Sequence, residues 1–106
     1  VWAWWCEPCR TELPLFDTLA ATHPDLNVVG VHADTTAANG AAMLNELDIS
    51  LPSYPDDRNI FDAKYSLPSV VPITVVIDKD GQVRATYTEA FGSIEEVEDA
   101  VNKALA

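Results

Sequence analysis

The sequence has few positive charges and no long apolar run. Of its 106 residues, 6 are Lys or Arg and 17 are Asp or Glu, so the net charge is −11. This excess of negative charge repels phosphate backbones and anionic lipid headgroups, which argues against nucleic acids and anionic membrane surfaces as partners. No apolar run approaches the roughly 20 residues that a membrane-spanning helix needs, and no signal peptide is visible.

Cysteine is scarce as well, with two in the chain, Cys6 and Cys9. Two cysteines are too few to hold a small secreted domain together without a core. A core is available, because 48% of the residues are apolar and 22% are charged, close to the averages of globular proteins. Disorder and fibrous repeats are therefore not expected, and the length predicts one domain over residues 1–106.

The chain starts with five apolar residues, Val1 to Trp5, that run directly into Cys6. A short aromatic run of this kind indicates the last part of a buried strand whose beginning lies upstream. We therefore expect residues 1–106 to be a fragment of a longer natural chain. Any targeting segment would then lie in the part outside this sequence.

Apolar periodicity predicts alternating helices and strands along the rest of the chain. Asp80–Gly81 predicts a hairpin, and Ser93 with Glu96 predicts a capping box for the last helix. Strands separated by helices and followed by a hairpin predict an α/β fold with a mixed sheet and helices on both faces. The expected helices cover residues 6–22, 36–47, 59–65 and the segment from 93, and the expected strands or extended segments cover 26–32, 49–55, 73–78 and 82–89.

The segment Cys6-Glu7-Pro8-Cys9 carries the chemistry. At the start of a helix, two residues three apart lie on one face with Cα atoms roughly 5 Å apart, which lets a disulfide open and close without much backbone movement. The helix N-terminus favours the thiolate of Cys6, so we expect Cys6 to be the attacking thiol and Cys9 the resolving one. Glu7 opposes this thiolate with its own charge, which predicts a reductant rather than a strong oxidant.

Taken alone, a Cys-x-x-Cys motif also fits a structural disulfide or half of a zinc site. Zinc needs four ligands, and the other soft candidates are His23 and His32, whose spacing does not fit the usual zinc-finger pattern. We therefore expect no metal, interpret both histidines as structural, and favour redox exchange because the motif lies between a strand and a helix.

Residues 2–14 read W-A-x-W-C-x-P-C-x-x-E-L-P, which resembles the signature of ResA/TlpA-type thiol-disulfide oxidoreductases of the thioredoxin superfamily. The resemblance continues through Val71–Pro72 and residues 78–81 to the closing helix. It implies a thioredoxin-like fold with a truncated first strand and a ResA/TlpA-type insertion over residues 34–67. Trp4 departs from the pattern, because the family usually has a small Thr or Ser at this position.

The same resemblance implies roles around the thiols. Glu12 would help to manage their protons, although its position also fits a surface glutamate on a solvated face. Pro72 would follow a cis peptide bond and face the cysteines, and the backbone of Val71 would pair with an extended substrate segment. Trp5 is expected to cover one flank of the site, where aromatic surface suits a protein partner. The candidate catalytic residues are thus Cys6, Cys9, Glu12 and Pro72, and the candidate substrate-binding residues are Trp5, Glu7, Pro8 and Val71.

These observations predict an enzyme that reduces disulfides in partner proteins, without a cofactor and with electrons from an upstream dithiol protein. The resemblance implies a bacterial, extracytoplasmic and often membrane-anchored location, with cytochrome c biogenesis as the best-known task, and we expect a monomer. Two alternatives stay open. One is a peroxiredoxin-like thiol peroxidase, and the other is a non-enzymatic metal carrier that uses Cys6, Cys9 and a histidine.

Overall fold

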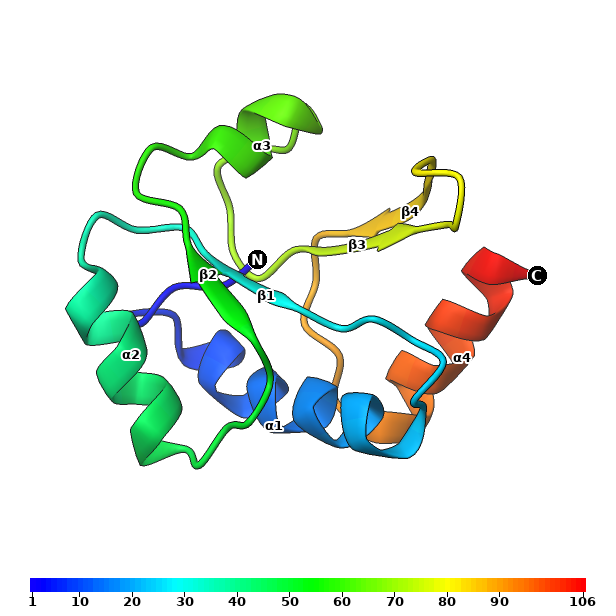
Figure 1. Cartoon of the computed structure of the whole chain (residues 1–106), viewed down its shortest axis with the longest axis horizontal. Coiled ribbons are helices and arrows are strands. Elements are labelled where there is room, and N and C mark those ends of the chain that lie inside the picture. The colour runs from blue at the N-terminus through cyan, green and yellow to red at the C-terminus, as the bar shows by residue number, and fades with distance from the viewer.

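The computed structural model describes residues 1–106 and contains four helices and four strands (Figure 1). The helices lie where the apolar periodicity predicts them, whereas the strands are shorter than expected. In chain order the elements are α1 (Glu7–Thr22), β1 (Gly30–His32), α2 (Ala37–Glu46), β2 (Ser53–Pro55), α3 (Ile60–Lys64), β3 (Thr74–Ile77), β4 (Val83–Tyr87) and α4 (Ile94–Leu105).

The strand expected over residues 26–32 begins only at Gly30, because the strand that pairs with it is only three residues long. β2 pairs with β1 in parallel over the three residues Ser53–Pro55. Residues 26–29 have no partner strand in the sheet, so they run beside the core without joining a ladder. The extended segment expected over residues 49–55 is likewise a strand only at its end, and it lies at an edge of the sheet, as its prolines predict.

The first residues of the chain join two separate ladders into one mixed sheet. β1 and β2 form a parallel ladder, and β3 and β4 form an antiparallel one. Trp2 donates its N–H to the Val31 carbonyl and accepts from the Ala33 N–H, both at 2.9 Å. On the other side, the Val1 nitrogen donates to the Ile73 carbonyl at 2.7 Å and the Val1 carbonyl accepts from the Ile73 N–H at 3.1 Å. The expected mixed α/β architecture is confirmed.

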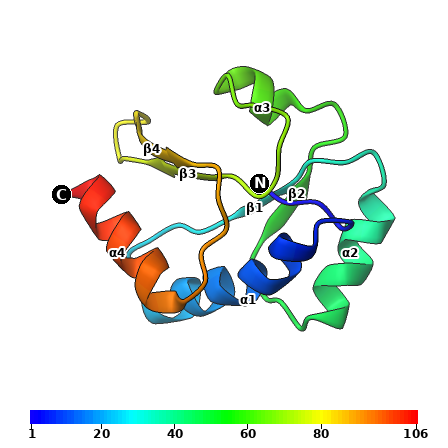
Figure 2. The ribbon, with the colours of Figure 1, turned by 180° about the vertical axis from the view of Figure 1, so that it is seen from behind.

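Helices pack on both sides of these strands. Both views show α3 across the strands from α1, and α4 beside the C-terminal half of α1 (Figures 1 and 2). Ser93 caps α4 by accepting the Glu96 N–H at 3.2 Å, as the predicted capping box requires. The Glu96 carboxylate accepts the N–H of Gly92 at 2.9 Å, whereas in the standard capping box it accepts the N–H of the cap residue itself. No helix combines the length and the apolar character needed to cross a membrane.

Two buried clusters make up the core. We call the first the cysteine cluster; it consists of Trp2, Ala3, Cys6, Cys9, Leu13 and Met43. We call the second the α4 cluster; it consists of Leu19, Val76, Val97 and Val101. The disulfide-forming residues therefore belong to the packed interior at one end of the molecule.

A largely apolar cleft of about 950 Å³ lies between β1 and β3, with Val1 among its lining residues. Beyond Val1, the facing edges of β1 and β3 have no strand between them. Residues that line the cleft include Leu19, Val28, Val31, Val75, Ile77 and Val101.

Candidate active site

Cys6 and Cys9 form a disulfide at the N-terminus of α1. Their Cα atoms are 5.2 Å apart, close to the spacing that one helical turn predicts. Cys6 is the N-cap residue, and its Sγ accepts the backbone N–H of Cys9 at 3.2 Å. Cys6 is 5% exposed and Cys9 is 1% exposed. Of the two sulfur-bearing side chains, that of Cys6 is therefore the one that a partner reaches more easily.

The residues just before Cys6 form a turn, closed by a bond of 3.1 Å from the Cys6 N–H to the Ala3 carbonyl. We call Ala3–Cys6 the tryptophan turn. Trp4 is 41% exposed and Trp5 is 58% exposed, whereas Trp2 is buried under the turn. The turn therefore presents two indole rings to solvent next to the disulfide. Trp5, the residue expected to cover one flank of the site, is the more exposed of the two.

His32, the last residue of β1, and Asp34, two residues after it, hold this turn. The buried ring of His32 accepts the Trp4 N–H at Nε2 over 3.2 Å, and it packs against the Trp2 ring with 4.5 Å between centroids. Asp34 accepts the indole N–H of Trp5 at Oδ2 over 2.6 Å. Hydrogen bonds from Thr36 and from Trp5 lower the pKa of the Asp34 carboxyl to about 2.

Glu12 lies one turn beyond Cys9 along α1 and is only 6% exposed, so it is not a surface glutamate on a solvated face. Its Oε2 accepts the Phe91 N–H at 2.9 Å. Burial raises the pKa of the Glu12 carboxyl above its ordinary value, although this hydrogen bond and the charge of the N-terminus act in the opposite direction. A buried carboxyl with a raised pKa can exchange a proton nearer to neutral pH than an exposed one.

The Val71–Pro72 peptide bond is cis, and Pro72 is buried. Val71 packs against the cysteine cluster, which brings this segment to the same end of the molecule as the disulfide. Glu7 and Pro8 lie in the first turn of α1, and both side chains are exposed. The eight candidate residues are thus distributed over the tryptophan turn, the first half of α1 and the Val71–Pro72 segment.

No group of three or more His, Cys, Asp or Glu side chains is arranged to hold a metal ion. The histidines have other contacts. His23 Nε2 lies 2.7 Å from a Glu98 carboxylate oxygen and so links the end of α1 to α4, and His32 holds the tryptophan turn. Neither histidine therefore lies with the two cysteines in such a group.

The sequence predicts an insertion over residues 34–67 and a second helix that begins at residue 36, but no role for Asp34 at the site. Thr36 is indeed the N-cap of α2, but its side chain makes no capping bond. Its hydroxyl and its N–H both donate to Asp34 Oδ1, which leaves Oδ2 of Asp34 for Trp5. The contacts of His32 and Asp34 with the turn were missed, because they join segments that only the sheet brings together.

The chain is similar to known proteins. The model of the AhpC/TSA family matches residues 1–86. A thioredoxin-like protein, YneN of Bacillus subtilis, is 32% identical over 87 residues, which cover 78% of this chain and 50% of that protein. The thiol-disulfide oxidoreductase ResA of Oceanobacillus iheyensis is 29% identical over 84 residues, covering 77% of this chain and 43% of that protein. The chain thus spans about half the length of these relatives or less.

The fold also matches solved structures. The crystal structure of a secreted disulfide oxidoreductase of Mycobacterium tuberculosis superimposes with a TM-score of 0.82 at 22% sequence identity, and the match covers 96% of this chain and 76% of that one. At this identity the similarity establishes the fold. Together with the sequence relatives and the Cys-x-x-Cys geometry, it confirms the expected resemblance to ResA/TlpA-type proteins of the thioredoxin superfamily. The chain belongs to the AhpC/TSA family.

Proposed function

We propose that this chain is a thiol-disulfide oxidoreductase domain that reduces disulfides in partner proteins. The observation that carries the proposal is the Cys6–Cys9 disulfide at the N-terminus of α1, with Cys6 as the helix cap. The N-terminal end of a helix favours negative charge, so the thiolate of Cys6 is stabilised at the position where it reacts. ResA of Oceanobacillus iheyensis, a sequence relative, is named for the same chemistry.

The reaction has two exchange steps. In the reduced enzyme, the Cys6 thiolate attacks one sulfur of a partner disulfide and forms a mixed disulfide, and the other partner sulfur leaves as a thiolate that takes up a proton. The Cys9 thiol then loses its proton and attacks Cys6 Sγ, which releases the second partner thiol and forms the Cys6–Cys9 disulfide. Two electrons pass to the partner, and an upstream dithiol protein restores the enzyme. No cofactor is required.

The surrounding residues have proposed roles in this cycle. Glu12, buried one turn beyond Cys9, accepts the Cys9 proton in the second step, since its raised pKa suits proton exchange. Trp5, Glu7, Pro8 and the Val71 backbone form the surface that a partner chain contacts, and Pro72 faces the cysteines as a catalytic candidate. The carboxylate of Glu7 disfavours the Cys6 thiolate, which predicts a reducing rather than an oxidising potential.

We propose that residues 1–106 are one domain of a longer chain. The apolar cleft between β1 and β3 supports this proposal, because a strand that continued upstream from Val1 would fill it and would pair with both edges. The buried α-amino nitrogen of Val1 would then be an ordinary amide N–H. Extending the expressed protein by its natural upstream residues should raise its melting temperature, and an unchanged melting temperature would refute this placement.

We also propose that the protein acts as a monomer outside the cytoplasm of a bacterium, anchored to the membrane through a segment beyond residues 1–106. Cytochrome c biogenesis, in which apocytochrome thiols are kept reduced for haem attachment, is the task that the resemblance to ResA/TlpA-type proteins suggests. The support is the ResA-type motif and the secreted Mycobacterium tuberculosis relative in fold. Fractionation of the full-length protein in its host tests the location.

A trapping experiment tests the proposed reaction. In a Cys9→Ala variant the second step cannot occur, so mixed disulfides at Cys6 should accumulate with disulfide-containing proteins such as insulin and should dissociate on addition of dithiothreitol. Cys6→Ala is the matched control and should trap nothing. The proposal is wrong if the wild-type protein does not reduce insulin. Turnover of hydrogen peroxide at a rate comparable with that of disulfides would support the peroxidase alternative instead.

A further inference from the structure

Trp5 is the most exposed tryptophan in the chain, yet its ring is anchored. Its side chain is 58% exposed, and its indole N–H donates to Asp34 Oδ2 at 2.6 Å. An exposed ring with a single polar anchor can keep one orientation only while that anchor holds, because solvent offers nothing to pack against. The position of this ring therefore depends on Asp34.

The anchor is itself fixed. The other oxygen of Asp34 accepts two bonds from Thr36, one from the N–H at 2.9 Å and one from the hydroxyl. These bonds hold the carboxylate at the start of α2, so Oδ2 points to the indole. Hydrogen bonds from Thr36 and Trp5 lower the Asp34 pKa to about 2, so the carboxylate is charged at neutral pH.

A second residue, His32, fixes the backbone that carries the Trp5 ring. His32 is 3% exposed and accepts the Trp4 N–H at Nε2, which places the proton of the neutral ring on Nδ1. α2 lies directly against this ring at Gly40, where a Cβ atom would come within 2.6 Å of Nδ1. His32 therefore sets the path of the tryptophan turn, and Asp34 needs to set only the side-chain angles of Trp5.

We propose that Asp34 is a positioning residue for partner recognition: it holds the Trp5 indole as a preformed wall beside Cys6, against which an apolar part of the partner's disulfide-bearing chain packs. The proposal rests on the function proposed above and extends it to a residue outside the Cys-x-x-Cys motif. Preorganised aromatic surface lowers the entropic cost of binding. The wall serves a protein substrate, whereas a small disulfide reaches Cys6 without touching it.

The test compares two substrates in an assay driven by dithiothreitol. Insulin is the protein probe and hydroxyethyl disulfide is the small one. Asp34→Ala should raise the KM for insulin about fivefold, the scale of one lost hydrogen bond, and leave kcat unchanged. The rate with hydroxyethyl disulfide should stay within about twofold of wild type, because loss of the indole anchor does not alter Cys6. Asp34→Asn should behave similarly, since its single carbonyl oxygen cannot serve both Thr36 and Trp5.

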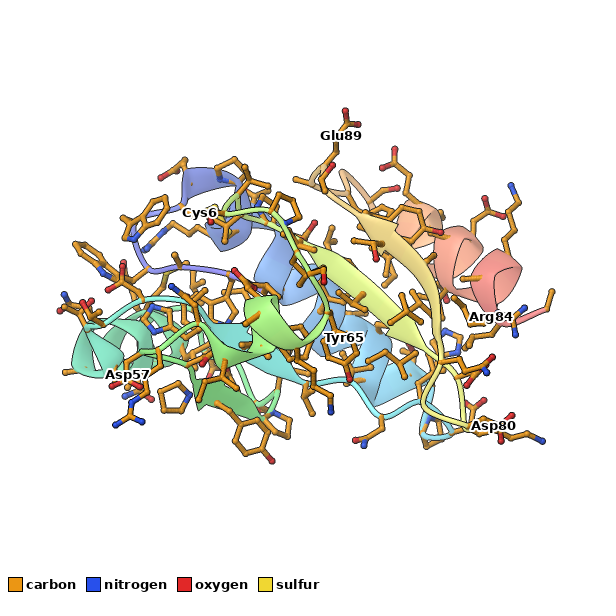
Figure 3. The ribbon with its side chains drawn as sticks, turned by 90° about the horizontal axis from the view of Figure 1, so that it is seen from above. Cys6, Asp57, Tyr65, Asp80, Arg84 and Glu89 are labelled. Atoms are coloured by element: carbon orange, nitrogen blue, oxygen red, sulfur yellow. A yellow bond between two sulfur atoms is a disulfide. The ribbon has the colours of Figure 1, made fainter.

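A double-mutant cycle shows whether Asp34 acts through Trp5. Trp5→Phe keeps a ring but removes the N–H, so it should raise the insulin KM, and adding Asp34→Ala to it should change nothing more. Asp78→Asn is the matched control, because Asp78 also accepts backbone N–H groups in a loop, from Asp80 and Gln82. Asp80 lies at the opposite end of the molecule from Cys6 (Figure 3).

Three results would overturn the proposal. An unchanged insulin KM in a folded Asp34→Ala protein means that the anchor does not matter for binding. Equal losses with insulin and hydroxyethyl disulfide mean that Asp34 supports Cys6 or the fold generally. Additive effects of Trp5→Phe and Asp34→Ala mean that the two residues act separately. Failure of the wild-type protein to reduce insulin, by contrast, is the result that refutes the proposed function itself.

Discussion

The cysteine cluster and the α4 cluster are built differently, although each forms part of the same small core. The α4 cluster is apolar throughout, and its helix carries a capping box and a regular apolar stripe. The cysteine end holds the two buried ionisable side chains, Glu12 and His32, together with exposed tryptophans. Burying an ionisable group lowers the stability of a fold unless the group has a hydrogen-bond or charge partner. The region around the cysteine cluster is therefore expected to contribute less to the free energy of unfolding than the region around the α4 cluster.

The largest expected effect on stability comes from the α4 cluster. Val97 is fully buried, so Val97→Ala should lower the free energy of unfolding by about 2 kcal/mol, through lost burial and the cavity that remains. The reduction potential of the Cys6–Cys9 disulfide in the Val97→Ala variant should equal that of the wild-type protein. Urea unfolding and equilibration with glutathione measure the two quantities. A changed reduction potential would show that packing in the α4 cluster affects the disulfide, so the two clusters would not be independent.

A smaller loss is expected at Gly40, where α2 lies on the His32 ring. Alanine in a helix is favoured over glycine by about 1 kcal/mol. Here the new Cβ would lie 2.6 Å from His32 Nδ1, in a buried site that cannot yield freely, and overpacking costs about 1–3 kcal/mol. Gly40→Ala should therefore be net destabilising. Gly92→Ala, whose Cβ would meet nothing closer than 3.7 Å, is the control and should not be. A stabilised Gly40→Ala protein would mean that the ring has room to move.

Glu12→Gln should change the pH dependence of stability. Burial raises the folded-state pKa of Glu12 above its ordinary 4.5, so its contribution to stability is present below pH 4.5 and is lost as the pH rises through the folded value. Glutamine keeps an acceptor for the Phe91 N–H and carries no charge. The variant should therefore gain stability relative to wild type as the pH rises from 4 to 8. A constant difference across this range would contradict the shift.

His32 should produce the opposite slope at the acidic side of neutrality. Burial lowers its pKa below the ordinary 6.5, against the attraction of Asp34. Its contribution to stability is therefore present above pH 6.5 and is lost as the pH falls through that value toward the folded pKa. His32→Leu should remove this slope, although it also removes the acceptor for the Trp4 N–H. Equal slopes for His32→Leu and wild type between pH 5 and 7 would exclude this assignment.

The sequence predicted the α4 end better than the cysteine end. Capping, hairpin and helix periodicity are local rules, and Ser93, Asp80–Gly81 and the α4 stripe obey them. The Cys-x-x-Cys geometry also followed from local rules, because both residues lie on one helical turn. The strand lengths and the contacts of His32 and Asp34 did not follow, since they depend on which segments the sheet places side by side.

The cap of α1 is the sulfur that the proposed reaction uses. Cys6 Sγ accepts the Cys9 N–H, so each bond made or broken at this atom changes the charge that holds the first turn of the helix. The Cys9 amide proton should consequently exchange with solvent more slowly when Cys6 is a thiolate than when it is joined to another sulfur. The hydrogen-exchange rate of the Cys9 amide would then report whether Cys6 is a thiolate or is bonded to another sulfur.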